Sequence, residues 1–304
     1  EALAVSMGEK ARVDMDYMCD LTGKTEEEIF ADLKGVIFLN PMHGYGNSTQ
    51  AKYLMADEYL SGNVREKLVL ARKSAELYPE DYTVNVETLE RVQPKDLTAS
   101  EIAVRLGATW LPTEIVEQFM FEFLGTPRYA QWNIKVHFSA YTGEWNIEGK
   151  SYDRSNVKAY STYGTGRINA YKIIEETLNL KDVRIFDYVE DADGKKKAVL
   201  NKKETAIAQA KQELIKQGFQ DWVWSDPERR ERLCRLYNDK FNSLRPREYD
   251  GSHIVFSGMN PEIELREHQR NAVAHILYGG NTLLAHAVGA GKTFEMVSAA
   301  MESK

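Results

Sequence analysis

Residues 13–39, VDMDYMCDLTGKTEEEIFADLKGVIFL, predict two short helices joined by a tight turn and followed by a strand. Apolar side chains recur at helical spacing up to Gly23, a residue type that commonly ends a helix. Thr25 and Glu28 have the spacing of a capping box, in which each side chain bonds the other residue's backbone N–H. The helix that they begin is expected to end at Gly35. The stretch therefore predicts a helix-turn-helix.

A pair of strands is expected directly after these helices. The apolar runs VIFL, residues 36–39, and KYLM, residues 52–55, flank a polar loop that contains glycines. A helix-turn-helix followed by a strand pair is the outline of a winged helix, in which residues 25–34 would take the recognition position. That helix carries four acidic side chains and one lysine: Glu26, Glu27, Glu28, Asp32 and Lys34. Because this charge repels phosphates, we favour packing or partner docking over sequence-specific DNA reading by this helix.

The rest of the chain alternates helices with short strand pairs. Helical spacing and end signals predict helices over 63–78, 99–107, 112–124, 165–180, 203–219, 226–244 and 265–277. Alternating patterns predict strand pairs over 131–149 and 183–201, the second with a tight turn at Asp193-Gly194. We therefore predict an α+β body that is mainly helical, with small antiparallel strand pairs.

The composition is typical of a soluble globular protein, with 43% hydrophobic and 28% charged residues in 304. No stretch approaches 18 consecutive apolar residues, so we expect no membrane span and no membrane partner. Cys19 and Cys234 fit no metal-site spacing and are expected to be reduced thiols of a cytosolic protein. Because the chain begins at Glu1 without a methionine, we expect it to be a piece of a longer protein.

Positive charge gathers in one part of a chain whose formal net charge is −7. Residues 195–247 hold 14 Lys and Arg against 7 Asp and Glu, a balance of 14 − 7 = +7. Six arginines and two tryptophans there are candidate DNA contacts: Arg229, Arg230, Arg232, Arg235, Arg245, Arg247, Trp222 and Trp224. Guanidinium groups beside aromatic rings suit phosphate contact and base stacking. The alternative is that the tryptophans belong to the core and the arginines form a solvated helix face.

The sequence GAGKT, residues 289–293, is typical of a phosphate-binding loop. Gly289, Ala290 and Gly291 would let backbone N–H groups face phosphate oxygens, at the start of a helix. Lys292 would contact the β- and γ-phosphates, and the Thr293 hydroxyl would bind Mg²⁺.

The residues around this loop agree with the general pattern of a phosphate-binding loop in most respects and differ from it at one position. The apolar run NTLLAHA, residues 281–287, predicts a buried strand, and the residues after Lys292 predict a helix. The pattern has a glycine where this chain has His286, a difference that many helicase-type ATPases share. Gln269 lies on the preceding helix, 292 − 269 = 23 residues before Lys292, and its amide is suited to pair with adenine.

Two groups of motifs resemble known families. LREHQ, residues 265–269, and LLAHAVGAGKTFEMVSAAMES, residues 283–303, resemble the Gln motif and first motif of a superfamily-two helicase of the Swi/Snf-like or restriction-associated kind. Residues 245–293 as a whole resemble the large DNA methyltransferase–helicase proteins of bacterial conjugative elements and phages. DLTGKTEEEIFADLKGVIFLNP, residues 20–41, and ADEYLSGNVREKL, residues 56–68, are similar to the spacer of that family.

The resemblance implies that the chain spans the spacer and the truncated start of an ATP-dependent DNA motor in a cytoplasmic bacterial protein. The expected domains are a winged-helix-like module over 1–95, an α+β module over 96–194, a basic helical module over 195–258 and the start of a P-loop α/β ATPase lobe over 259–304. In the intact protein Lys292 and Thr293 would bind ATP and Mg²⁺, and Gln269 would bind adenine. The Asp-Glu box, the arginine finger and a methyltransferase motif are missing from this sequence, so we expect this segment to be inactive by itself and to hold no nucleotide.

Three functions stay open at this stage. The body of the chain could couple the adjoining methyltransferase and helicase domains while contacting DNA. It could instead be a structural coupler or interaction scaffold that binds no DNA. The motor itself could be a translocase that separates no strands, because translocation and unwinding share these motifs.

Overall fold

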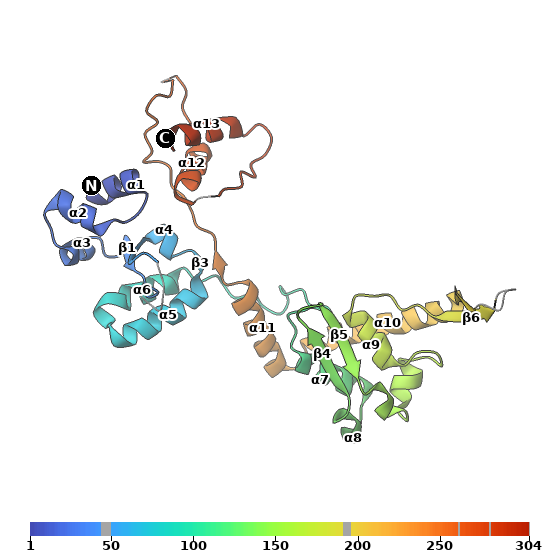
Figure 1. Ribbon diagram of the computed structural model, residues 1–304. Coiled ribbons are helices and arrows are strands. Elements are labelled where there is room, and N and C mark those ends of the chain that lie inside the picture. Colours follow the sequence, from blue (N-terminus) through green and yellow to red (C-terminus); the bar gives the residue numbers. More distant parts are fainter. Residues whose placement is uncertain (44–49, 191–195, 261, 280, 304) are drawn as a thin grey trace. The chain divides into compact units, whose positions relative to one another are not determined.

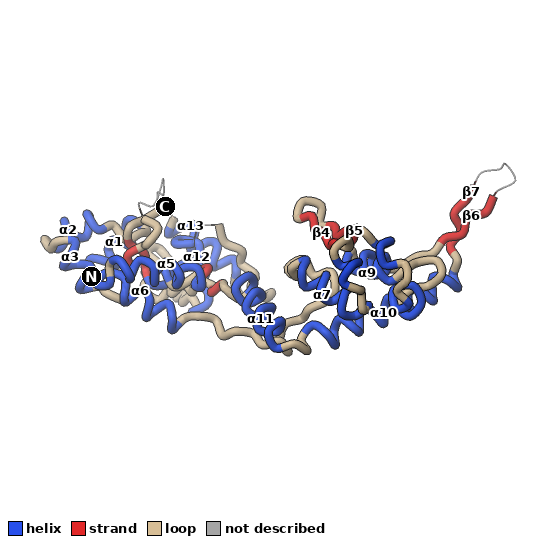
Figure 2. The backbone as a smooth tube through the Cα atoms, turned by 90° about the horizontal axis from the view of Figure 1, so that it is seen from below, coloured by secondary structure: helices blue, strands red, loops and turns tan. Residues whose placement is uncertain are grey.

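The computed structural model describes residues 1–304 except 44–49, 191–195, 261, 280 and 304. The chain divides into two compact units, of which unit 1 comprises residues 1–95 and 241–304, and unit 2 comprises residues 96–240. Helices predominate in both, and the strands form small antiparallel pairs (Figures 1 and 2), which confirms the predicted fold class. The division into four domains stays a prediction. The basic stretch expected over 195–258 continues from unit 2 into unit 1.

Unit 1 begins with the predicted helix-turn-helix and strand pair. Its first elements are α1 (Ala2–Lys10), α2 (Met15–Thr22), α3 (Glu26–Asp32), β1 (Ile37–Leu39) and β2 (Tyr53–Met55). Gly23 ends α2 in the left-handed conformation, and the capping box of Thr25 and Glu28 begins α3. β1 pairs antiparallel with β2, and Met18 and Ile29 are buried between the helices and this pair. The helix-turn-helix and its strands are therefore confirmed, and α1 precedes them.

A second set of elements completes the first part of unit 1. It comprises α4 (Ala56–Tyr59), β3 (Gly62–Asn63), α5 (Val64–Leu77), α6 (Pro79–Arg91) and β8 (Leu244–Arg245), which pairs with β3. Pro79 begins α6, where a proline loses no hydrogen bond because the first turn of a helix leaves its N–H groups unpaired. The sequence indicated only that a helix ends before Pro79. Phe38 stacks on Tyr59 in the core beneath these helices.

Unit 2 is built on two helices that flank a β-hairpin. Its elements are α7 (Thr113–Leu124), α8 (Arg128–Gln131), β4 (Lys135–Ser139), β5 (Glu144–Glu148), the 3₁₀ helix η1 (Lys150–Asp153), the π-helix η2 (Lys158–Thr162), α9 (Ala170–Leu178), β6 (Phe186–Glu190), β7 (Lys196–Leu200), α10 (Lys202–Val223) and α11 (Pro227–Phe241). The hairpin β4–β5 places Trp145 and Ile147 on α9 and α7. Both predicted strand pairs of this unit are confirmed, and the turn at Asp193-Gly194 lies outside the described residues.

The helix predicted over 99–107 is wrong. This segment consists of turns and irregular backbone, in which Ile102, Val104 and Leu106 are buried. Buried side chains at every second position have the period of an extended chain, so packing against the core outweighs a weak helical preference. Gly107 has φ +97°, and a Cβ there would lie 2.5 Å from the backbone oxygen of Leu178.

Unit 1 ends with α12 (Glu267–Gly279) and α13 (Lys292–Glu302), which pack on each other. The strand predicted over 281–287 is wrong: these residues are irregular, and Leu283 is 87% exposed. A strand needs a neighbour for its backbone hydrogen bonds, and none of the strands in the described ranges pairs with this segment. None of the described helices combines the length and the apolar character needed to cross a membrane.

Candidate nucleotide-binding site

The GAGKT loop joins α12 to α13 and begins α13 in the structure. Gly291 is the residue before the helix, with φ 89° and ψ 30°, and Gly289 has φ 87°. Glycine adopts this left-handed backbone without strain, whereas other residues do not. The first N–H groups of a helix have no partner within the helix and mark its positive end. The loop therefore presents backbone donors where the sequence places a phosphate site.

Lys292 is held by the loop itself. Its Nζ donates to the backbone oxygen of His286 at 2.7 Å and to that of Ala287 at 3.1 Å. An ammonium group has three donors, so these two bonds leave one for an incoming anion. The adjacent Thr293 is exposed. The two side chains expected to hold phosphate and Mg²⁺ are thus neighbours at the start of α13.

Gln269 connects α12 to the loop. Its Nε2 donates to the backbone oxygen of Ala290 at 3.1 Å, and its Oε1 accepts the N–H of Arg266 at 2.9 Å. The side chain is 6% exposed, and a Cβ on Gly291 would lie 2.2 Å from its Nε2. Gln269 would have to give up these partners to pair with adenine. Adenine contact by Gln269 stays a prediction, and its contact with the loop is a role that sequence reasoning missed.

A buried carboxylate supports the loop from α13. Glu295 is fully buried, and its Oε1 lies 2.8 Å from Nδ1 of His286. Its Oε2 has no hydrogen-bond partner in the described part of the chain. The Nε2 of His268 lies 3.1 Å from the backbone oxygen of Ala290. His286, which stands where the general pattern has a glycine, therefore connects the loop to α13 through Glu295. Helical spacing offered a signal, because Glu295 shares a face with Ser298 and Ala299.

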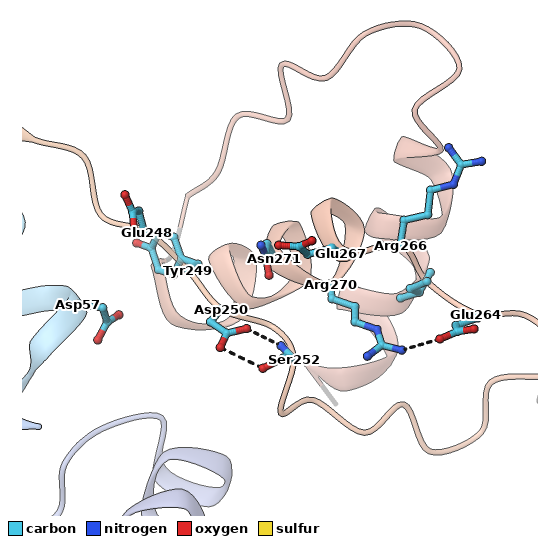
Figure 3. Close-up of a pocket in the computed structure, with 11 residues that line it drawn as sticks. Asp57, Glu248, Tyr249, Asp250, Ser252, Glu264, Arg266, Glu267, Arg270 and Asn271 are labelled. Carbon is cyan, nitrogen blue, oxygen red and sulfur yellow. Dashed lines mark hydrogen bonds and ion pairs between the residues drawn. The ribbon is translucent and has the colours of Figure 1, made fainter.

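A cleft of about 1000 Å³ lies beside the start of α12 (Figure 3). Its charged lining comprises Asp57, Glu248, Asp250, Glu264, Glu267, Arg266 and Arg270. Arg270 is 3.6 Å from Glu264, and Asp250 accepts the N–H and the hydroxyl of Ser252. These bonds hold the pKa of Asp250 below its usual value. Five carboxylates against two guanidinium groups disfavour a polyphosphate, so the cleft is a poor site for a nucleotide.

The candidate DNA contacts are divided between the two units. Arg245 and Arg247 lie in unit 1, where they bond the backbone oxygen of Leu60 at 3.0 Å and Asp57 at 2.8 Å. The other candidates lie in unit 2: Arg229, Arg230, Arg232, Arg235, Trp222 and Trp224.

Several of the unit 2 candidates make internal contacts. Arg229 is 5% exposed, lies 3.5 Å from the Trp222 ring centroid and donates to the backbone oxygens of Trp222 and Val223. Burial lowers the pKa of Arg229. Trp222 packs on Phe119, and Arg235 lies 3.4 Å from Asp96. These contacts favour a structural role for Arg229 and Trp222, and DNA contact by the set stays a prediction.

Comparison with protein families gives two matches. Residues 1–50 match the family described as "Probable helicase, winged helix domain". The match covers the helix-turn-helix and β1, and it indicates a helicase-related protein. Residues 105–243, most of unit 2, match a family described as a domain of unknown function, DUF8437. No curated protein and no solved structure matched the chain.

Proposed function

We propose that this chain is part of an ATP-driven DNA helicase or translocase, and that the GAGKT loop receives the phosphates of Mg–ATP. The observation that carries the proposal is the loop at the start of α13, with Lys292 beside two glycines in left-handed backbone. The helicase-type winged helix match at residues 1–50 supports the same class of protein.

The residues present suit a magnesium nucleotide. Lys292 would donate its remaining N–H to a phosphate oxygen, while Thr293 would supply a hydroxyl ligand to the metal. Backbone N–H groups from Gly289 onward would surround the phosphates. The bound group would supply the free energy of phosphate transfer, and the protein residues would position and neutralise it.

Within the longer protein we propose that the body of the chain couples this motor to a DNA adenine methyltransferase domain in a bacterial cytoplasm. The second candidate is a structural coupler that binds no DNA. The internal contacts of Arg229, Arg235 and Arg247 favour this second candidate for the basic stretch.

The test is Lys292→Ala in the intact protein. We expect the variant to lose ATP hydrolysis, because the Lys292 ammonium group would neutralise charge on the β- and γ-phosphates. DNA methylation is expected to continue. Lys73→Ala is the matched control, since Lys73 is an exposed lysine of α5 far along the chain from the loop. Unchanged hydrolysis by Lys292→Ala would contradict the motor proposal.

A further inference from the structure

Unit 2 exposes three large aromatic side chains around α8. Trp132 is 81% exposed, Tyr129 is 61% exposed and Tyr152 is 59% exposed. Tryptophan is usually among the more buried residue types, so an exposed one beside two tyrosines indicates a surface that contacts something else. Three cations lie on the same segments. We define the aromatic surface as Arg128, Tyr129, Trp132, Tyr152, Arg154 and Lys158.

The two segments that carry these residues lie side by side. A Cβ on Gly149 would lie 2.0 Å from the backbone oxygen of Asn133, so the backbones after β5 and before β4 are in close contact. Asn156 donates to the backbone oxygen of Leu124 at 3.1 Å. The Lys158 side chain lies 3.9 Å from the position of a Cβ on Gly125. Segments separated by about twenty to thirty positions in the sequence therefore lie next to each other.

The cations of this surface are available for a ligand. Across the described residues, no side-chain hydrogen bond or ion pair engages Arg128, Arg154 or Lys158. Lys150 and Lys172 of the same unit differ from them, because both pair with Glu175. The neighbouring Asp153 is buried, and its Oδ2 accepts from Asn156 and Tyr171 at 2.6 Å. Positive charge is thus exposed here without a compensating carboxylate bond.

We propose that the aromatic surface binds single-stranded nucleic acid. Bases would stack on the rings of Trp132, Tyr129 and Tyr152, because stacking accepts any base. Phosphates would contact the guanidinium groups of Arg128 and Arg154, and this contact makes affinity depend on salt. An apolar protein partner would bury the rings but leave the unpaired cations without a counter-charge, so the charge favours nucleic acid.

The inference does not depend on the GAGKT loop. It names a site in unit 2, within the stretch that matches the domain of unknown function. Binding is expected without nucleotide, and Lys292→Ala should bind single strands as the unchanged protein does. Either proposal can therefore fail while the other holds.

The test is fluorescence anisotropy of labelled oligo-dT titrated with the whole chain at low and moderate salt. We expect Trp132→Ala and Tyr152→Ala each to weaken binding roughly tenfold, the effect of one lost base stack. Arg128→Gln should flatten the dependence of log affinity on log salt by about 0.7, as one lost phosphate contact does on a single strand. Tyr141→Ala is the matched control, because Tyr141 is 99% exposed in the turn between β4 and β5, at the opposite end of the hairpin.

Two results would overturn the proposal. One is the absence of salt-sensitive oligo-dT binding by the unchanged protein, which would leave a protein partner as the occupant of the surface. The other is equal binding by Trp132→Ala and the unchanged protein. Circular dichroism checks that each variant is folded. Trp132→Phe should recover part of the affinity, because it retains a ring that stacks.

Discussion

Unit 2 contains two groups of arginines and aromatic rings, one buried and one exposed. Arg229 is buried on Trp222 and donates to backbone oxygens at the end of α10. Arg128 is exposed beside Trp132, which is 81% exposed. The first group stabilises the fold, whereas the second is open to a ligand. The same residue types therefore have different roles in the two groups. Burial and hydrogen-bond partners distinguish the structural group from the exposed one.

The largest expected effect is on the buried group. Arg229→Ala should lower the free energy of unfolding by about 3 kcal/mol, because it leaves two carbonyl oxygens without a charged donor and removes the cover of the Trp222 ring. Urea unfolding followed by tryptophan fluorescence measures it. Arg232→Ala is the control in the same helix, since Arg232 is exposed. Equal stability of the two variants would remove the distinction between the groups.

A second prediction concerns a buried carboxylate that pairs with lysines. Burial alone would raise the pKa of Glu175, but hydrogen bonds from Lys150, Lys172 and the Ile147 N–H hold it below its usual value. A lowered pKa in the folded state means that this stability is full above the unfolded pKa of about 4.3 and is lost as pH falls through the folded pKa.

The corresponding variant is Glu175→Gln, which should lower the free energy of unfolding by about 2 kcal/mol at neutral pH, because the three hydrogen bonds from Lys150, Lys172 and the Ile147 N–H lose a charged acceptor. Urea unfolding at a series of pH values provides the measurement. The difference between variant and unchanged protein should shrink below pH about 4. A difference that grows as the pH falls would contradict the assigned pairing.

The smallest expected effect is on the exposed group. Trp132→Ala should change the free energy of unfolding by less than about 0.5 kcal/mol, because a side chain that is already in water loses little burial. Thermal unfolding by circular dichroism measures it. A loss of stability close to that of Arg229→Ala would mean that Trp132 belongs to the core of the unit. That result would contradict its role in the proposed nucleic-acid surface.

The candidate site was predictable in part. The GAGKT loop, its helix and the position of Lys292 follow from residues next to one another in the chain. The support from Glu295 and His268 does not, because it depends on how α12 and α13 pack. The strand expected over 281–287 was wrong for the same reason, since strand formation requires a paired neighbour.

By itself the sequence determined the local features of this protein. Asp14 and Gly23 delimit α2, the capping box begins α3, and Asp226 accepts the Arg229 N–H at 2.7 Å in the first turn of α11. These capping interactions join residues three or four positions apart, so they form independently of contacts with distant parts of the chain. Only the tertiary structure decided which arginines are buried and which are free. Burial and counter-charge come from residues far away in the sequence, as when Arg247 meets Asp57 or when Gly149 approaches Asn133.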